Sequence, residues 1–319
     1  MIAQVTLSCR IRNTLMEIVA FEGWPKVAKL VSGSLEAYVS LDFGPRVLRL
    51  GFAGGPNFFA VYDRHKGLSG GDTYRSYGGH RLWTAPEVAS RTYEADNQPV
   101  ISEALVDGGV RFTTPLGPTQ LQRSITITPL DEREGFIVDH EVRNLGTASV
   151  EIAAWALSVM APGGVCLIPQ HEFLSHKEAL LPARPVVMWP YTKMTDPRWT
   201  WGDQVIRLRQ DAGMAAPQKV GALVSQGYAA YALHGGLFFK RFGYEEDAQY
   251  PDFGVNFEAY TRDDMLEVES LSPLTRLEPG YSIPHREVWY ALPSVKVPES
   301  DEDCADWLAM LASSHPYLP

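Results

Sequence analysis

The sequence predicts an all-β protein built from antiparallel strands, and three observations lead to this fold class. Glycine and proline, which interrupt helices and occupy turns, occur 27 and 23 times in 319 residues. Short runs of alternating or β-branched residues recur along the chain, and turn residues separate them. The chain is also rich in aromatic residues, with 8 Trp, 14 Tyr and 13 Phe. Together these features indicate a sandwich or barrel of many short strands.

The predicted elements are strands almost to the end of the chain. They cover residues 35–41, 46–52, 58–63, 100–106, 109–115, 121–130, 135–145, 149–160, 205–210, 229–235, 236–244, 257–262, 265–271 and 286–292. A short C-terminal helix is expected over residues 300–314, where Ser300 can act as its N-cap and acidic residues follow. Its apolar face would carry Cys304, Trp307, Leu308 and Leu311. No change in composition marks a boundary, so residues 1–319 are expected to form a single domain with its core at about 20–295.

Composition excludes several classes of function. The 38 acidic against 28 basic residues give a formal charge of −10, which disfavours nucleic acid and anionic membranes as partners. No apolar run approaches the roughly 20 residues that a membrane helix needs. The N-terminal residues lack the pattern of an export signal, so a cytoplasmic protein is expected. Cys9, Cys166 and Cys304 lie too far apart in sequence to suggest a disulfide framework or a metal site, and no cofactor is expected.

Two short motifs do not fit the context that their chemistry needs. Gly67-Leu68-Ser69-Gly70-Gly71 has the spelling of a nucleophile elbow, but no helix can follow it. His171 and His176 are spaced one residue too far apart for a zinc-protease helix. The segment 161–204 remains the longest stretch without clear strand signals, and it is expected to be either a functional loop or a proline-stiffened surface excursion.

The densest run of polar and aromatic residues follows the glycine pair at 78–79. His80, Arg81, Trp83 and Glu87 supply an imidazole, a guanidinium, an indole and a carboxylate within eight positions. Such groups can bind sugar hydroxyls, stack on a sugar ring and move a proton. The alternative is a turn followed by an edge strand whose charged residues are merely solvated.

A second cluster lies between residues 240 and 290. It contains Lys240, Asp252, Glu258, Glu267 and Glu269. In a strand, Glu267 and Glu269 point to the same face, and two adjacent carboxylates raise the pKa of one of them. The pair therefore suggests either acid–base chemistry or simply a polar, solvated face of a sheet.

Several strings in this sequence resemble the galactose mutarotase-like (aldose 1-epimerase-like) superfamily. They are YGGHRLWTAPE, DFGPRVLRLGF and NFEAYTRDDMLEVESLSPLTRLEPG, with LTRLEPGYSIPHREVWYAL as the closing element. The resemblance covers residues 20–295 and implies a β-supersandwich that binds a carbohydrate on one concave face. It further implies Glu269 as catalytic base, with Glu267 as the alternative, and His80 as acid. Arg81, Trp83 and Glu87, together with Lys240, Asp252 and Glu258, are then expected to bind the sugar.

One position departs from the pattern of the superfamily. Trp155 stands where aldose 1-epimerases carry their acid histidine, and an indole cannot act as an acid. Three functions therefore stay open: an epimerase-like sugar isomerase, a non-catalytic sugar-binding or regulatory protein, and a glycoside lyase or hydrolase. Because Arg81, Lys240 and Arg241 are basic, a phosphorylated sugar is a further hypothesis.

Overall fold

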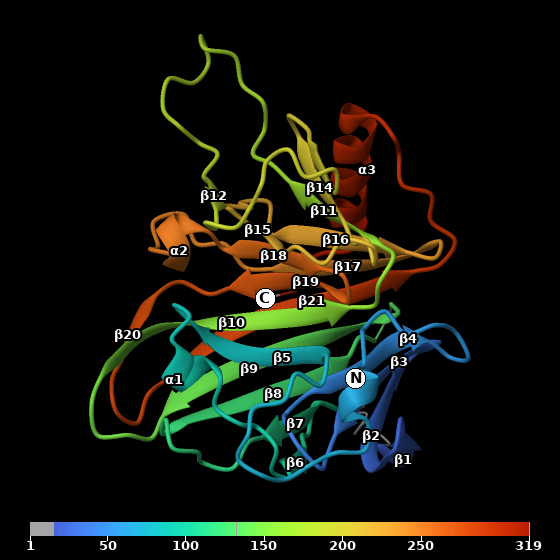
Figure 1. The fold of residues 1–319 in the computed structure, drawn as a ribbon, viewed down its shortest axis with the longest axis vertical. Coiled ribbons are helices and arrows are strands. Elements are labelled where there is room, and N and C mark those ends of the chain that lie inside the picture. Colours follow the sequence, from blue (N-terminus) through green and yellow to red (C-terminus); the bar gives the residue numbers. More distant parts are fainter. Residues whose placement is uncertain (1–15, 132, 319) are drawn as a thin grey trace, which may run out of the picture.

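Two large antiparallel sheets, packed face to face, make up the chain (Figure 1). The structure is a computed structural model that describes residues 16–131 and 133–318. The predicted all-β sandwich is therefore confirmed. Cys9 and the N-terminal residues expected to lack an export signal lie outside the described residues.

Within the described residues, the first sheet has 11 strands, in the order β1-β2-β3-β4-β5-β10-β19-β18-β15-β12, with β20 paired to β10. Its strands are β1 (Glu17–Phe21), β2 (Trp24–Ser32), β3 (Leu35–Ser40), β4 (Val47–Phe52), β5 (Gly79–Ala85), β10 (Val150–Met160), β12 (Val186–Met188), β15 (Gln218–Ala222), β18 (Phe257–Arg262), β19 (Met265–Leu271) and β20 (Thr275–Leu277). Neighbours in the middle of this sheet come from distant parts of the sequence, which brings β5, β10 and β19 side by side.

The second sheet has 10 strands, in the order β13-β14-β11-β16-β17-β21-β9-β8-β7-β6. Its strands are β6 (Ile101–Ala104), β7 (Val110–Thr113), β8 (Leu121–Pro129), β9 (Gly135–Asn144), β11 (Val165–Pro169), β13 (Trp199–Trp201), β14 (Val205–Arg209), β16 (Tyr228–Leu233), β17 (Gly236–Phe242) and β21 (Ser282–Leu292). Alternating side chains of both sheets, such as Phe112, Val138, Ala154 and Val268, form one buried apolar core between them.

Helices are few and short in the part of the chain that the structure describes. They are the 3₁₀ turn η1 (Asp63–His65), α1 (Ala89–Thr92), α2 (Pro251–Gly254) and the C-terminal α3 (Asp301–Ser314). The hydroxyl of Ser300 accepts a hydrogen bond from the Asp303 backbone amide, which confirms the predicted cap and helix. Buried Cys304, Leu308 and Leu311 pack on the outer face of the second sheet. Among the described residues, no helix combines the length and apolar character needed to cross a bilayer.

One predicted strand, and one alternative that the sequence left open, differ from the structure. Residues 58–63 make only isolated bridges, at Phe59 and Val61, instead of a strand. Conversely, β5 is a central strand between β4 and β10, and not an edge strand. Gly78 and Gly79 lead into it with positive φ, and a Cβ on either would lie within 2.3 Å of a backbone oxygen. The glycine pair therefore permits close packing against neighbouring backbone.

Candidate functional site

The outer face of the first sheet carries a row of polar and aromatic side chains. Residues that pair directly across neighbouring strands project to the same side of a sheet. Leu157 pairs with both Arg81 and Glu269, and Glu269 pairs in turn with Glu258. In the next row on one side, Trp83 pairs with Trp155. In the next row on the other side, Tyr260 pairs with both Glu267 and Lys219. Strands from three separate stretches of sequence thus build one surface.

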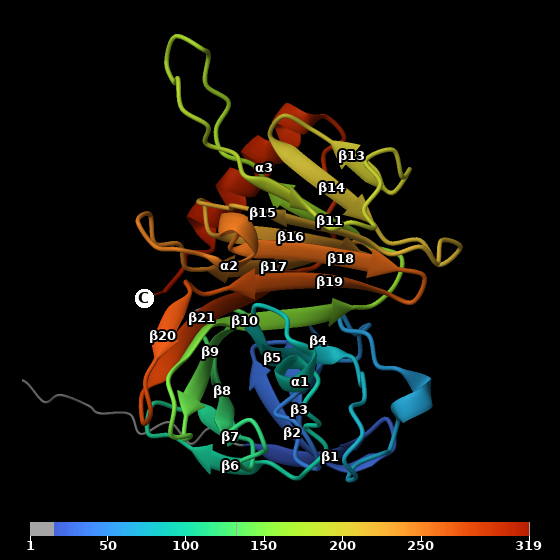
Figure 2. The ribbon, with the colours of Figure 1, turned by 60° about the vertical axis from the view of Figure 1, so that its left-hand side comes forward.

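A cavity of about 360 Å³ lies on this surface, and we call it the aromatic pocket. The segments before and after β5, together with those of Tyr191 and Pro217, supply its walls. In Figure 2, α1 and α2 lie in front of this face of the sheet. Its lining residues are Tyr74, Ser76, Arg81, Trp83, Glu87, Tyr93, Trp155, Leu157, Tyr191, Pro217, Lys219, Tyr260, Met265 and Glu267. Rings therefore surround a small number of charged groups, which is typical of small-molecule sites.

Glu267 is the carboxylate of β19 that reaches the aromatic pocket. It is 8% exposed, and its Oε1 lies 3.2 Å from an NH2 nitrogen of Arg81. Burial raises the pKa of Glu267 to about 7, although Arg81 acts in the opposite direction. The Arg81 guanidinium in turn lies 3.8 Å from the centre of the Trp83 ring. Glu267 can therefore exchange a proton near neutral pH.

Glu269 lies beneath the pocket and is not one of its lining residues. It is fully buried, and its Oε2 accepts a hydrogen bond of 2.8 Å from the indole of Trp155. The same oxygen lies 3.3 Å from Nζ of Lys219, which is 2.7 Å from buried Glu258. Burial raises the pKa of Glu258 well above its usual range. Of the two candidate bases, Glu267 lines the cavity. Glu269 does not line it, but contacts Trp155 and Lys219, which do.

Lys219 is a functional candidate that no sequence pattern indicated. Its ammonium lies 4.7 Å from the ring of Trp155 and 4.6 Å from that of Trp189. Burial acts to lower the pKa of Lys219, but the neighbouring Glu269 and Glu258 hold this pKa above its usual value. A lysine in a short alternating strand carries no motif of its own, and Lys219 is recognised only by its ion pairs with Glu258 and Glu269 in the folded chain.

His80 does not face the aromatic pocket, which corrects its expected partnership with Glu269. Side chains alternate along a strand, so His80 and Arg81 must project to opposite faces of β5. His80 is fully buried between the sheets, where Nδ1 lies 2.9 Å from the Ser158 hydroxyl and Nε2 lies 2.7 Å from Nε2 of His140. Burial lowers the pKa of His80 well below its usual range.

Lys240 and Asp252 also do not line the pocket. Lys240 is fully buried between the sheets, 2.8 Å from Glu287, and donates to the backbone oxygen of Val268. Asp252 belongs to α2, outside the ring of lining residues. Arg241 points to the other side of its strand, where it donates to backbone oxygens at the end of α3. Lys240 and Arg241 therefore cannot form a joint phosphate site.

The buried groups between the sheets form a closed hydrogen-bond network, which we call the inter-sheet network. His140 Nδ1 faces the backbone oxygen of His285, so it carries the proton, and His140 Nε2 accepts from His80. Glu287 accepts from Ser270, Trp289 and Lys240. The ligand atoms of His80, His140 and Glu287 lie within 4.8 Å of one another, a spacing that a metal ion could use. However, the ammonium of Lys240 already supplies the positive charge beside Glu287.

The segment 161–204 has two parts with different roles. It contains β11, β12 and β13, and the loop between β11 and β12 projects from the body of the molecule (Figure 1). Only its later part reaches the site, where Tyr191 lines the aromatic pocket and Trp189 covers Lys219. The projecting part exposes Leu180 and Leu181 instead.

Comparison with solved structures finds the same fold in other proteins, whereas sequence comparison finds no match. No family model matches the sequence, and no curated protein matches it in sequence. The Slr1438 protein from Synechocystis sp. PCC 6803 superposes with a TM-score of 0.54 at 12% identity, covering 88% of this chain and 100% of its own. A galactose mutarotase-like protein from Lactobacillus casei gives 0.51 at 11% identity, covering 83% and 100%. A further galactose mutarotase-like protein, from Clostridium acetobutylicum, gives 0.51 at 9% identity, covering 88% and 99%.

The two antiparallel sheets define a β-sandwich, and the aromatic pocket lies on the outer face of one of them. More particularly, the chain has the galactose mutarotase-like fold.

Proposed function

We propose that this protein binds a carbohydrate in the aromatic pocket. The observation that carries the proposal is the combination of ring faces with charged hydrogen-bonding groups on one surface. Trp83, Trp155 and Tyr74 can pack against the C–H faces of a pyranose, while Glu267 accepts from its hydroxyls and Arg81 donates to them. The fold shared with galactose mutarotase-like proteins supports the same substrate class.

Ligand titration of a tryptophan variant tests the binding proposal. Saturation-transfer NMR against D-glucose, D-galactose, D-mannose and their 6-phosphates should give signals with the wild type. Trp83→Ala should weaken the affinity at least tenfold, because it removes a stacking face. Trp201→Ala is the matched control, since Trp201 lies on β13 at an edge of the other sheet. Equal binding by wild type and Trp83→Ala would argue against this pocket.

The catalytic form of the proposal is an aldose 1-epimerase-like isomerase with Glu267 as the proton-transfer group. Its carboxylate would take the proton of the anomeric hydroxyl while a tyrosine hydroxyl protonates the ring oxygen; the opened aldose rotates and recloses with both protons returned. Tyr191 and Tyr260 line the same cavity, and burial raises the pKa of each, so both keep their protons. This assigns to Glu267 the base role first expected of Glu269.

Polarimetry distinguishes this isomerase from a binding protein. Glu267→Gln should slow anomerisation at least about 100-fold, as expected for loss of a general base. The non-catalytic alternative is favoured by the absence of any histidine from the described residues that line the pocket. It predicts ligand binding with no turnover by the wild type. An unchanged rate in Glu267→Gln would remove Glu267 from the mechanism.

A further inference from the structure

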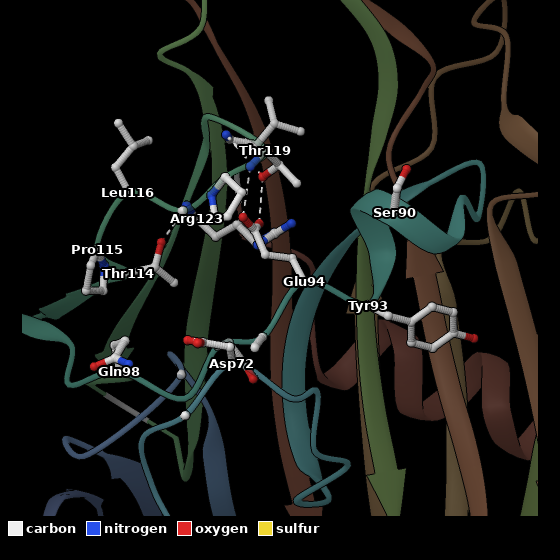
Figure 3. Close-up of a pocket in the computed structure, with 17 residues that line it drawn as sticks. Asp72, Ser90, Tyr93, Glu94, Gln98, Thr114, Pro115, Leu116, Thr119 and Arg123 are labelled. Atoms are coloured by element: carbon white, nitrogen blue, oxygen red, sulfur yellow. Dashed lines mark hydrogen bonds and ion pairs between the residues drawn. The ribbon is translucent and has the colours of Figure 1, made fainter.

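A second cavity, which we call the Arg123 cavity, adjoins the aromatic pocket. Its volume is about 410 Å³, and the loops at 71–72, 90–98 and 114–119 line it together with Arg123 (Figure 3). Tyr93, the residue that follows α1, lines both cavities. In Figure 3 its ring points away from Glu94 and Arg123, and it packs edge-on against Tyr74 and Trp83 in the aromatic pocket. Tyr93 is therefore the wall that the two cavities share.

Arg123 brings unused hydrogen-bond donors to this cavity. Its side chain is only 9% exposed, and one NH1 nitrogen lies 3.1 Å from Oε2 of Glu94. Its Nε and NH2 nitrogens have no partner among the described residues. Glu94 cannot turn to meet them, because its oxygens already accept from the backbone amide and the hydroxyl of Thr119. Buried guanidinium donors of this kind call for a partner that fills the cavity.

The same cavity also offers an unused acceptor. Asp96 pairs through Oδ2 with Arg46, and its buried Oδ1 has no partner among the described residues. Thr114 accepts from the Arg123 backbone amide, so its hydroxyl hydrogen is free to donate. Asp72 lies on the rim, and with Glu94 and Asp96 it disfavours a free anion. The unused donors of Arg123 and Thr114 and the unused acceptor of Asp96 match hydroxyl groups, which both donate and accept.

We propose that the Arg123 cavity binds a second sugar unit of the carbohydrate whose first unit occupies the aromatic pocket. The ligand is then an oligosaccharide or glycoside, and its linkage passes Tyr93, the residue that lines both cavities. This inference rests on the proposed carbohydrate function and assigns Arg123 and Asp96 to recognition of the second unit.

Calorimetric titration with matched sugars tests the inference. The probes are glucose, galactose and mannose, each with its β-1,4- and α-1,4-linked di- and trisaccharides. Wild type should bind the best disaccharide at least tenfold more tightly than its monosaccharide. Arg123→Met should lose that advantage and keep the monosaccharide affinity within about twofold. Arg111→Met is the matched control, because Arg111 is half exposed on β7 and pairs with Glu141.

A second variant separates recognition from folding. Gln98 is an exposed residue of the cavity lining, so Gln98→Trp should fill the cavity without disturbing the pair of Arg123 and Glu94. It should likewise abolish the tighter binding of the disaccharide relative to its monosaccharide. Equal affinities for mono- and disaccharide in the wild type, with neither variant having an effect, would overturn the second subsite and leave the carbohydrate function standing. Failure of every sugar to bind would overturn both.

Discussion

At the scale of single residues, alternation along strands decides which groups share a site. Arg81 and Trp83 both line the aromatic pocket because they are two positions apart on one strand. His80, which lies between the glycine pair and Arg81, points to the opposite face and is buried in the core. The same rule places Glu267 and Glu269 on one face, as expected. It cannot tell which of them reaches the cavity, because that depends on Trp155 and Lys219 covering Glu269.

Glu267 gives a prediction for stability against pH. Its folded pKa, about 7, lies above its usual value of 4.5, so the folded state holds the proton more tightly than the unfolded chain. The stability that it contributes is therefore lost as pH rises from 4.5 to 7. Glu267→Gln mimics the protonated form and should raise the free energy of unfolding above pH 7 by up to about 3 kcal/mol.

Urea denaturation at pH 4 and pH 8 measures this effect. Little change is expected at pH 4, where the wild-type carboxyl is already protonated. Equal effects of the substitution at both pH values would show that Glu267 does not titrate in this range. Glu278→Gln is the control, since Glu278 is an exposed carboxylate beside Arg276.

At the scale of elements, the sequence predicted most strands by their alternation and β-branched residues. The central strand β5 was not predicted, because its glycine pair and its charged residues are typical of a turn or an edge strand. What holds it in the sheet is its pairing with β10 along its whole length, and glycine at positions 78 and 79 leaves room for the backbone oxygens of Ala60 and Val47. The helix α3 was predictable because its cap and its apolar face are local signals.

The pairing of β17 with β21 gives a prediction about the inter-sheet network. Lys240 and Glu287 are both fully buried, and the ammonium and carboxylate lie 2.8 Å apart. Lys240→Met leaves Glu287 charged and without its cation, which should lower the free energy of unfolding by about 3–5 kcal/mol. The double variant Lys240→Met/Glu287→Gln should recover part of this loss in chemical denaturation. A double variant less stable than the single one would contradict the argument.

At the scale of the whole molecule, the buried histidines should set the response to acid. Burial lowers the pKa of His80 and His140, and lowers that of His285 from 6.5 to about 3. Groups with a lowered folded pKa bind fewer protons in the folded state, so stability is lost as pH falls below 6.5. Glu267 and Glu258, whose pKa values are raised, act in the opposite direction, but three histidines oppose two carboxyls.

Thermal denaturation between pH 7 and pH 4 checks this expectation. The melting temperature should fall on acidification, and His285→Gln should make the fall shallower by removing one of the buried imidazoles. Gln can still donate to Ser270, which the imidazole contacts in the wild type. A melting temperature that rises steadily towards pH 4 would mean that the histidines do not govern acid stability.

The sequence by itself determined the β-sandwich, the C-terminal helix and the residues from which a sugar site can be drawn, because strand periodicity, capping and turn chemistry are local. Only the tertiary structure decided which of those residues meet. Sheet order brings β5, β10, β19, β18 and β15 together from distant parts of the chain, and burial then separates Glu267 at the pocket from Glu269 and His80 beneath it. Neither long-range strand pairing nor burial can be read from local sequence patterns.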